Sequence, residues 1–428
     1  MMTLVKADGK REYALLERLA ARNGETDRKV TAAVGDILTA VRERGDEAVL
    51  EYTRRFDGVD APLTCVEREQ LGELAAACEP RLMEALRRAA ANIEEFHRRQ
   101  VQQSWLTTRE DGVILGQRIR GLERVGLYVP GGTAAYPSSV LMNAIPARIA
   151  GVKELIMVTP PQKSGGFNTA VMAAAYIAGV DRVYLCGGAQ AVAALAYGTA
   201  TIPKVDKIVG PGNIYVATAK RLLFGQVDID MIAGPSEILV LADETADPAY
   251  LAADLMSQAE HDVLASAILL TDSEEIARET LAQVEKQLAA LSRAEIVRRS
   301  LEDYGVAIVC RDMDEAVEFA NELAPEHLEV RCREPMAYLG RLDNAGSVFL
   351  GKYSPEPLGD YYAGPNHVLP TSGTARFFSP LSVDSFVKKS SFISYNQKAL
   401  EAAREDIVAI AMAEGLDAHA NSIKIRTE

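Results

Sequence analysis

The sequence is poor in cysteine and histidine, and it contains no long apolar run. Its cysteines are odd in number and scattered, so they show neither paired metal-binding spacing nor a disulfide framework. Reduced thiols and a cytoplasmic location are therefore expected. No stretch reaches the roughly 18 consecutive apolar residues of a membrane-spanning helix. The charged residues 1–11 lack the apolar centre of a secretory signal. The five cysteines are Cys65, Cys78, Cys186, Cys310 and Cys332.

The charge balance is acidic. The chain has 46 lysines and arginines against 60 aspartates and glutamates, and its net charge is −14. Because phosphate backbones require a basic surface, no nucleic-acid partner is expected. The 428 residues, 48% of them apolar and 25% charged, are typical of a globular protein with two or three domains.

Hydrophobic periodicity predicts an α/β fold. Apolar residues at three- and four-residue steps, such as Val30, Val34, Ile37 and Val41, predict helices in the first third. Between about residues 150 and 240, short apolar runs alternate with single helical segments. This alternation predicts a parallel sheet with helices on both faces. The pattern resumes more loosely afterwards, so two Rossmann-like parallel-sheet units are expected, one inserted into the other.

These patterns also predict the domain boundaries. The expected parts are a small helical extension (1–25), a larger α/β unit (26–126 and 237–378), an inserted α/β unit (127–236) and a helical tail (379–428). A stretch rich in glycine, proline and tyrosine, residues 353–373, is too long for a plain connector. Long ordered loops of this kind are often functional.

A candidate metal site begins at Gln258 and His261, which are three residues apart and share one face of a predicted helix. An amide oxygen and an imidazole nitrogen could bind the same ion. Asp360 and His419 are candidates for the remaining ligands, and such a set suits zinc or another divalent first-row metal. The alternative is that His261 is a packed or solvated side chain, because sequence spacing does not show that the four residues converge.

Glu326 and His327 are adjacent and follow Pro325, which marks a chain reversal. A neighbouring carboxylate and imidazole could serve as two proton-transfer groups with different tasks. The alternative is an ordinary surface pair.

Glycine-rich turns lie at three strand ends, at Gly131-Gly132, Gly187-Gly188 and Gly210-Pro211-Gly212-Asn213. Such turns present backbone N–H groups to which a phosphate could bind. None is the full dinucleotide fingerprint. Two of them are successive strand-to-helix junctions of one predicted parallel sheet, and this favours a nucleotide site at the carboxyl ends of its strands.

Two further residues are expected to be structural. Cys186 ends an apolar strand with no basic neighbour, so a buried thiol is favoured over a covalent nucleophile. His97, beside Arg98 and Arg99, is expected on a solvated helix face.

Taken together and in order, the motifs resemble those of the histidinol dehydrogenase family, and the resemblance covers nearly the whole chain. The motifs are residues 126–132 (GLYVPGG), 187–191 (GGAQA), 210–213 (GPGN), 233–237 (AGPSE), 258–262 (QAEHD), 324–328 (APEHL), 359–361 (GDY), 364–371 (GPNHVLPT) and 414–419 (EGLDAH).

The resemblance implies a role for each matching residue. Gln258, His261, Asp360 and His419 would hold one zinc ion and, with it, the substrate. The other substrate-binding residues would be Ser236, His327, His367 and Glu414. The residues that contact NAD would be Tyr128, Gln190 and Asn213, which places the NAD site in the inserted unit and the zinc site in the larger one.

The resemblance also implies a mechanism and an assembly. His327 would accept the hydroxyl proton of L-histidinol as hydride passes to a first NAD, and Glu326 would activate water to hydrate the resulting aldehyde. A second hydride transfer to a second NAD would then give L-histidine. The family forms homodimers in which the C-terminal tail reaches the partner's site, so Glu414 and His419 would act there.

Three other functions remain open from the sequence. A related zinc- and NAD-dependent dehydrogenase could act on another small alcohol, such as a sulfonated diol, although Glu414 suits a cationic substrate better. A zinc hydrolase could use Glu326 or Glu260 to activate a metal-bound water. A non-catalytic metal-binding protein would leave the proton-transfer residues without a role.

Overall fold

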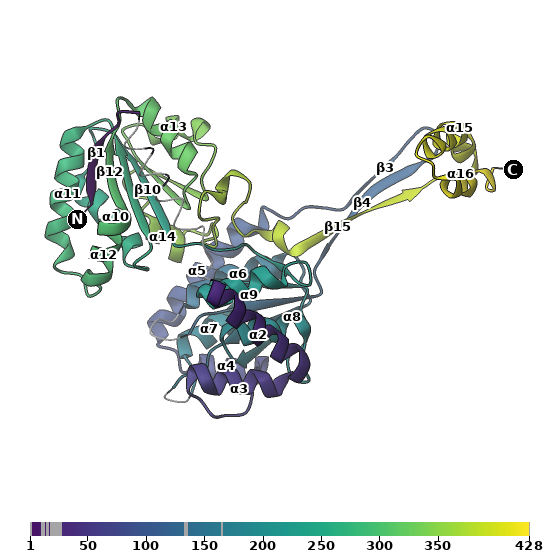
Figure 1. Ribbon diagram of the computed structural model, residues 1–428, viewed down its shortest axis with the longest axis horizontal. Coiled ribbons are helices and arrows are strands. Elements are labelled where there is room, and N and C mark those ends of the chain that lie inside the picture. The colour runs from purple at the N-terminus through teal and green to yellow at the C-terminus, as the bar shows by residue number, and fades with distance from the viewer. Residues whose placement is uncertain are drawn as a thin grey trace.

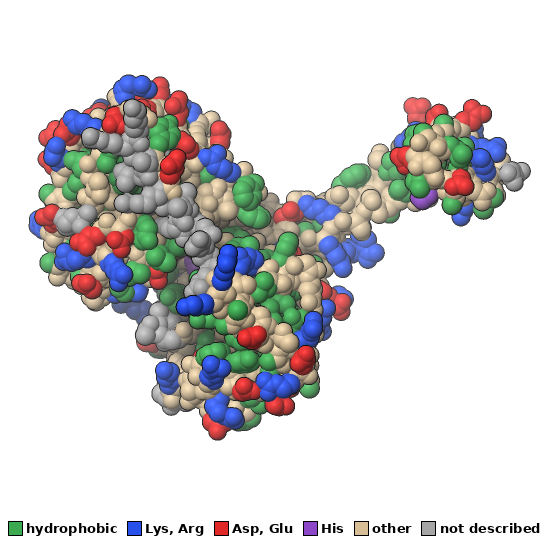
Figure 2. Space-filling view, viewed as in Figure 1, with side chains coloured by type: hydrophobic (Ala, Val, Ile, Leu, Met, Phe, Trp, Pro, Cys, Tyr) green, Lys and Arg blue, Asp and Glu red, His purple; other side chains and the backbone are tan. Residues whose placement is uncertain are grey.

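The computed structural model describes residues 2–9, 13, 17, 28–131, 136–163 and 166–427. Most of the expected N-terminal helical extension therefore lies outside the described residues. Among the helices that are described, none is both long enough and apolar enough to cross a membrane. In the view of Figure 2, acidic and basic side chains are intermixed over the surface.

The first of two α/β units, here called the inserted unit, is built on a six-stranded sheet in the order β2-β7-β6-β5-β8-β9. Only β2 runs antiparallel to its neighbour. The strands are β2 (Cys65–Glu67), β5 (Arg124–Tyr128), β6 (Glu154–Thr159), β7 (Arg182–Leu185), β8 (Lys207–Val209) and β9 (Asp228–Ile229).

Helices cover both faces of this sheet, as the alternating pattern predicts (Figure 1). On one face lie α2 (Arg28–Arg44), α3 (Asp46–Asp57), α8 (Gly188–Tyr197) and α9 (Ile214–Leu223). On the other lie α4 (Arg68–Ala75), α5 (Pro80–Arg98), α6 (Pro137–Ile149) and α7 (Thr169–Ile177). The predicted apolar stripe of α2 is the face that is buried.

The second unit, here called the outer unit, has a fully parallel sheet in the order β1-β12-β11-β10-β13-β14. Its strands are β1 (Thr3–Lys6), β10 (Glu237–Ala242), β11 (Ser266–Thr271), β12 (Gly305–Val309), β13 (His327–Arg331) and β14 (Ser347–Leu350). Its helices are α10 (Pro248–Ala259), α11 (Glu274–Leu288), α12 (Ala294–Tyr304), α13 (Met313–Leu323) and α14 (Glu356–Tyr361). Short 3₁₀ turns are η1 (Pro335–Ala337), η2 (Leu339–Arg341), η3 (Thr374–Arg376) and η4 (Val383–Phe386).

A third part, here called the arm, projects away from both units (Figure 1). It consists of a three-stranded antiparallel sheet, β15-β4-β3, and two terminal helices. Its elements are β3 (Trp105–Thr108), β4 (Ile114–Gly121), β15 (Val387–Ser394), α15 (Gln397–Ala413) and α16 (Asp417–Lys424). Large apolar side chains on the arm are exposed, among them Leu106, Ile393 and Ile410, and exposed apolar surface of this kind marks contact surfaces.

One α/β unit is inserted between β1 and β10 of the other, but three segments differ from the predicted division. Residues 28–98 pack on the inserted unit, not on the outer one, because the apolar faces of α2 to α5 are buried against the sheet that contains β5 to β8. Residues 3–6 form β1, which pairs with β12, instead of a helix. The tail of residues 379–428 also contains a strand, because β15 finds its partner β4 some 270 residues earlier in the chain.

Candidate active site

The candidate catalytic residues lie where the strands of the outer sheet begin. His327 is the first residue of β13 and pairs with Ile238 of β10, while Ser236 directly precedes β10. The end of α10, with Gln258, leads into the start of β11. The site is thus at the amino edge of a parallel sheet, whereas the general rule for such sheets expects the carboxyl edge.

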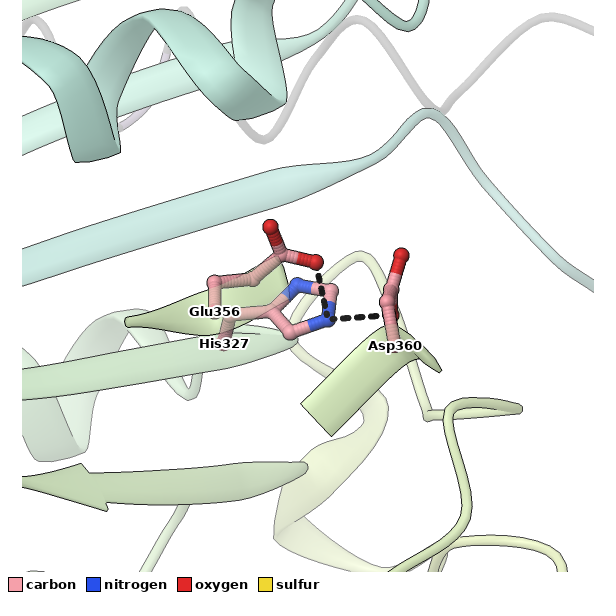
Figure 3. Close-up of side chains that lie close together, drawn as sticks. All are labelled: His327, Glu356 and Asp360. Atoms are coloured by element: carbon pink, nitrogen blue, oxygen red, sulfur yellow. Dashed lines mark ion pairs between the residues drawn. The ribbon is translucent and has the colours of Figure 1, made fainter. Parts of the chain in front are cut away.

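Hydrogen bonding fixes the tautomer of His327. Its Nδ1 lies 3.0 Å from the carbonyl oxygen of Glu237, and because a carbonyl only accepts, Nδ1 must donate. Nε2 is therefore the basic nitrogen. It is buried, has no hydrogen-bond partner among the described residues, and lies 3.7 Å from Glu356 and 3.9 Å from Asp360 (Figure 3).

Acidic neighbours control the charge of His327. Burial lowers the pKa of the imidazole, but the charges of Glu326, Glu356 and Asp360 outweigh it and raise the pKa to about 10. Glu326 is the largest of these raising contributions. A dication held by Asp360 would offset part of this negative charge and bring the pKa of His327 down toward the range useful for a general base.

Glu326 lies on the opposite side of the ring from the free nitrogen. Its carboxylate accepts a hydrogen bond from the backbone N–H of Glu237 at 2.9 Å and is 3.5 Å from Nδ1 of His327. Both side chains are almost fully buried. The backbone of β10 therefore holds the carboxylate and the imidazole in one fixed arrangement.

Glu356 is a buried residue that the sequence analysis missed. Its carboxyl faces His327 from α14 (Figure 3), and Ser257 Oγ lies 3.5 Å from it. Burial, reinforced by the charge of Asp360, raises the pKa of Glu356 to about 8. The signal available in the sequence was spacing, because Glu356 and Asp360 are four residues apart and so share one helix face.

Two different sets of side chains are candidate ligands for a metal ion at this site. In the described part of the chain, one group of His, Cys, Asp or Glu side chains, namely His327, Glu356 and Asp360, has ligand atoms within 4.8 Å of one another. Of the four zinc ligands that the resemblance implies, namely Gln258, His261, Asp360 and His419, only Asp360 belongs to this group. Gln258 nevertheless fits as a ligand, because its amide oxygen is buried without a hydrogen-bond partner and the adjacent Ser257 touches Glu356 of α14. His261 lies just past the end of α10, exposed in a turn closed by its N–H to the carbonyl of Gln258 at 3.1 Å.

Glu414 and His419 are not brought to the site of their own chain. Glu414 caps the end of α15 and His419 lies in α16, at the tip of the arm (Figure 1). Both are exposed. Within this one chain, the site lacks the two residues that the motif at 414–419 would contribute.

His367 lies in the long loop that was expected to be functional, and it joins the site to the inserted unit. Its Nδ1 lies 3.1 Å from the carbonyl oxygen of Asp360, and its Nε2 is 3.4 Å from the hydroxyl of Ser139 on α6. Burial lowers the pKa of His367. A cavity of about 230 Å³ is lined by His327, Asp360 and His367 together with residues of β14, which is room for a small substrate.

The residue before His367, Asn366, makes a second contact between the outer unit and the inserted unit. Asn366 donates to the carbonyl of Met142 at 2.7 Å and lies 3.4 Å from Nε2 of His97. His97 is fully buried, so the expectation of a solvated face is wrong. The helix α5 that carries His97 is covered by this loop, a long-range contact that its basic neighbours Arg98 and Arg99 do not reveal.

A larger cavity of about 1190 Å³ lies at the carboxyl ends of the inserted sheet. The glycine turns predict a nucleotide site at this edge, and Tyr128, Gln190 and Asn213, which the resemblance assigns to NAD, all line the cavity. Gln190 is buried, and neither its amide oxygen nor its nitrogen has a hydrogen-bond partner among the described residues. Such a paired donor and acceptor fits a polar ligand in this cavity.

Local contacts shape the wall of this cavity. Gly188 donates its backbone N–H to the Tyr128 hydroxyl at 3.1 Å, and burial raises the pKa of Tyr128 to about 12. Asn213 caps α9 by accepting from two backbone N–H groups. Gly132 lies outside the described residues. Cys186 is fully buried and burial raises its pKa, which confirms a core thiol and not a nucleophile.

Comparison with known proteins matches this arrangement over almost the full chain. The family model for histidinol dehydrogenase matches residues 20–427. The histidinol dehydrogenase of Geobacillus kaustophilus is 59% identical over 396 residues, covering 92% of this chain and 93% of that protein. That of Clostridium acetobutylicum is 54% identical over 98% of this chain and 96% of its own length. A crystal structure of histidinol dehydrogenase from Elizabethkingia anophelis superposes with a TM-score of 0.93 at 38% identity, covering 99% and 98% of the two chains. The chain therefore belongs to the histidinol dehydrogenase family.

Proposed function

We propose that the chain oxidises L-histidinol to L-histidine through L-histidinaldehyde, in two NAD-dependent steps of histidine biosynthesis. The observation that carries this proposal is the fixed tautomer of His327, whose unpartnered Nε2 lies beside Glu356 and Asp360. His327 lines the small cavity together with Asp360 and His367. Family membership over nearly the whole chain supports it.

The side chains available in the two cavities support zinc and NAD as the cofactors. The unpartnered oxygen of Gln258, the exposed imidazole of His261 and the carboxylate of Asp360 suit zinc, with His419 as the fourth ligand. Tyr128, Gln190 and Asn213 would contact NAD in the larger cavity. When bound, zinc fixes the nitrogens of the substrate and NAD accepts the hydride.

The residues of the chain supply the proton transfers. Nε2 of His327 accepts the hydroxyl proton in the first oxidation, and its Nδ1–H stays bonded to the Glu237 carbonyl. Glu326 activates water for hydration of the aldehyde, and His327 assists again in the second oxidation. Ser236, His367 and Glu414 position the substrate.

The assembly completes the site. We infer a homodimer in which Glu414 and His419 of one subunit enter the site of the other, because the arm carries both residues away from the site of its own chain (Figure 1). The exposed apolar side chains of the arm suit such a contact. On this assignment, the inserted unit binds NAD, the outer unit holds zinc and the catalytic pair, and the protein acts in the cytoplasm.

Metal content distinguishes the two competing ligand sets. Gln258→Ala should weaken zinc binding at least about tenfold, because it removes a direct ligand. Glu356→Gln should retain zinc, because Glu356 is not in the proposed set. Zinc per subunit, measured by mass spectrometry after dialysis against a weak chelator, gives the answer. Loss of zinc from Glu356→Gln with retention in Gln258→Ala would assign the ion to the His327–Glu356–Asp360 group instead.

The decisive assay mixes the purified protein with L-histidinol and NAD and follows NADH absorbance and histidine formed. Two NADH per histidine are expected, with activity lost on chelation and restored by zinc. A zinc hydrolase would produce no NADH, and a dehydrogenase for another alcohol would produce none from histidinol.

A further inference from the structure

One acidic residue in the wall of the larger cavity has a buried carboxylate oxygen without a hydrogen-bond partner among the described residues. Asp57 is the last residue of α3 and lines the cavity together with Tyr128 and Gln190. Its Oδ2 atom is buried and, in the described ranges, has no hydrogen-bond partner. A carboxylate at a helix C-terminus also faces the negative end of the helix dipole. Residues that break local rules in this way are expected at functional sites.

Among the described residues, the nearby cations Arg54 and Lys163 form no ion pair with Asp57. Arg54, three residues before Asp57, is committed to Asp60, with a hydrogen bond of 2.8 Å. Lys163 lowers the pKa of Asp57 through its charge, against a larger rise caused by burial. The negative charge of Asp57 in turn raises the pKa of Tyr128, so this charge acts on other residues that line the cavity. The carboxylate is therefore available to accept hydrogen bonds from a ligand.

The topology decides which part of a dinucleotide would meet Asp57. The inserted unit touches the catalytic loop through α6, where Ser139 contacts His367. The reacting end of the dinucleotide must point that way. In Figure 1, α3 lies on the opposite side of the inserted unit from α14. The wall formed by α3 is thus the place for the adenosine end.

We propose that Asp57 accepts hydrogen bonds from the ribose hydroxyls of the adenosine half of NAD and thereby excludes NADP. An unpaired carboxylate there binds a diol and repels a 2′-phosphate. This inference rests on the proposed function, which supplies the dinucleotide as the ligand. It also gives α3, a helix that the sequence pattern placed in the other unit, a direct part in cofactor choice.

The test is binding of ADP-ribose and of its 2′-phosphate to the zinc-loaded protein by titration calorimetry, without catalysis. The wild-type protein should prefer ADP-ribose, and Asp57→Asn should reduce that preference at least about tenfold, as loss of a charge-assisted hydrogen bond implies. The matched control is Glu47→Gln, which removes an acidic charge from the exposed start of the same helix. Arg44 keeps Glu51 as its partner there, so the preference should stay unchanged. Asp57→Glu keeps the charge and should keep preference for ADP-ribose.

Two results would overturn this inference. In the first, Asp57→Asn keeps the wild-type preference for ADP-ribose. In the second, it lowers the affinities for ADP-ribose and for its 2′-phosphate equally, as a general disturbance of the cavity would. Thermal melting of each variant identifies unfolding, and Asp57→Glu then provides the second comparison. Failure of the protein to oxidise histidinol, with the ADP-ribose preference still dependent on Asp57, would overturn the proposed function and not this inference.

Discussion

Replacing Glu326 with glutamine should stop the second oxidation while sparing the first. The glutamine oxygen can still accept from the Glu237 N–H, and His327 keeps its own bond to the Glu237 carbonyl, so the base for the first step stays in place. Hydration of the aldehyde loses its carboxylate, and loss of a general base slows a step by roughly a hundredfold or more. Rapid mixing of enzyme, histidinol and NAD should give a first NADH at near wild-type rate, with oxidation of added histidinaldehyde greatly slowed.

The same variant should also shift the pH dependence of the first step. Glu326 makes the largest acidic contribution to the raised pKa of His327. Without that charge His327 loses its proton at lower pH, so the acid limb of the first oxidation should move to lower pH. An equal loss of both steps, or an unmoved acid limb, would remove Glu326 from its assigned role.

Mixing two inactive variants should restore activity if the arm completes the partner's site. His327→Asn disables the outer unit, and His419→Asn disables the arm. In a mixed dimer, one site combines the intact outer unit of one chain with the intact arm of the other. Random pairing makes about half of the dimers mixed, each with one of two sites intact, so about a quarter of wild-type activity should return.

The control for this mixture pairs two lesions of the outer unit. His327→Asn mixed with Glu326→Gln should not recover the complete two-step reaction, because each site carries one lesion whichever arm it receives. If the first mixture also stays inactive after unfolding and refolding together, the sites are not shared between subunits. Zinc content of the mixed sample provides a second readout, since His419 is a proposed ligand.

Much of the fold was accessible from periodicity alone. The apolar stripe of α2 and the strand and helix alternation of the inserted unit follow local patterns that strands and helices impose on a sequence. Periodicity did not show to which of the two units each helix or strand belongs. An apolar helix face does not specify its partner, so α2 to α5 were assigned to the wrong sheet, and β15 was missed because its pairing with β4 is long-range.

At the candidate site, too, some residues were predictable from the sequence and others were recognised only from the tertiary structure. Glu326, His327 and Asp360 were identifiable from motifs, and the structure brings them together. Glu356 carries no motif of its own, and it matters because folding buries it against His327. Asp57 likewise has an ordinary surface sequence around it, and only the packing of α3 on the inserted unit turns it toward the cavity.

The sequence by itself determined the α/β class, the order of the motifs and the chemical types available to the site, because these depend on residue identity and short-range periodicity. Tertiary structure alone decided that the catalytic pair sits at the amino edge of the outer sheet, that His367 and Asn366 tie this edge to the inserted unit, and that His419 points away on the arm. Those outcomes depend on which apolar faces bury one another and which strands pair across hundreds of residues, and no local pattern encodes that choice.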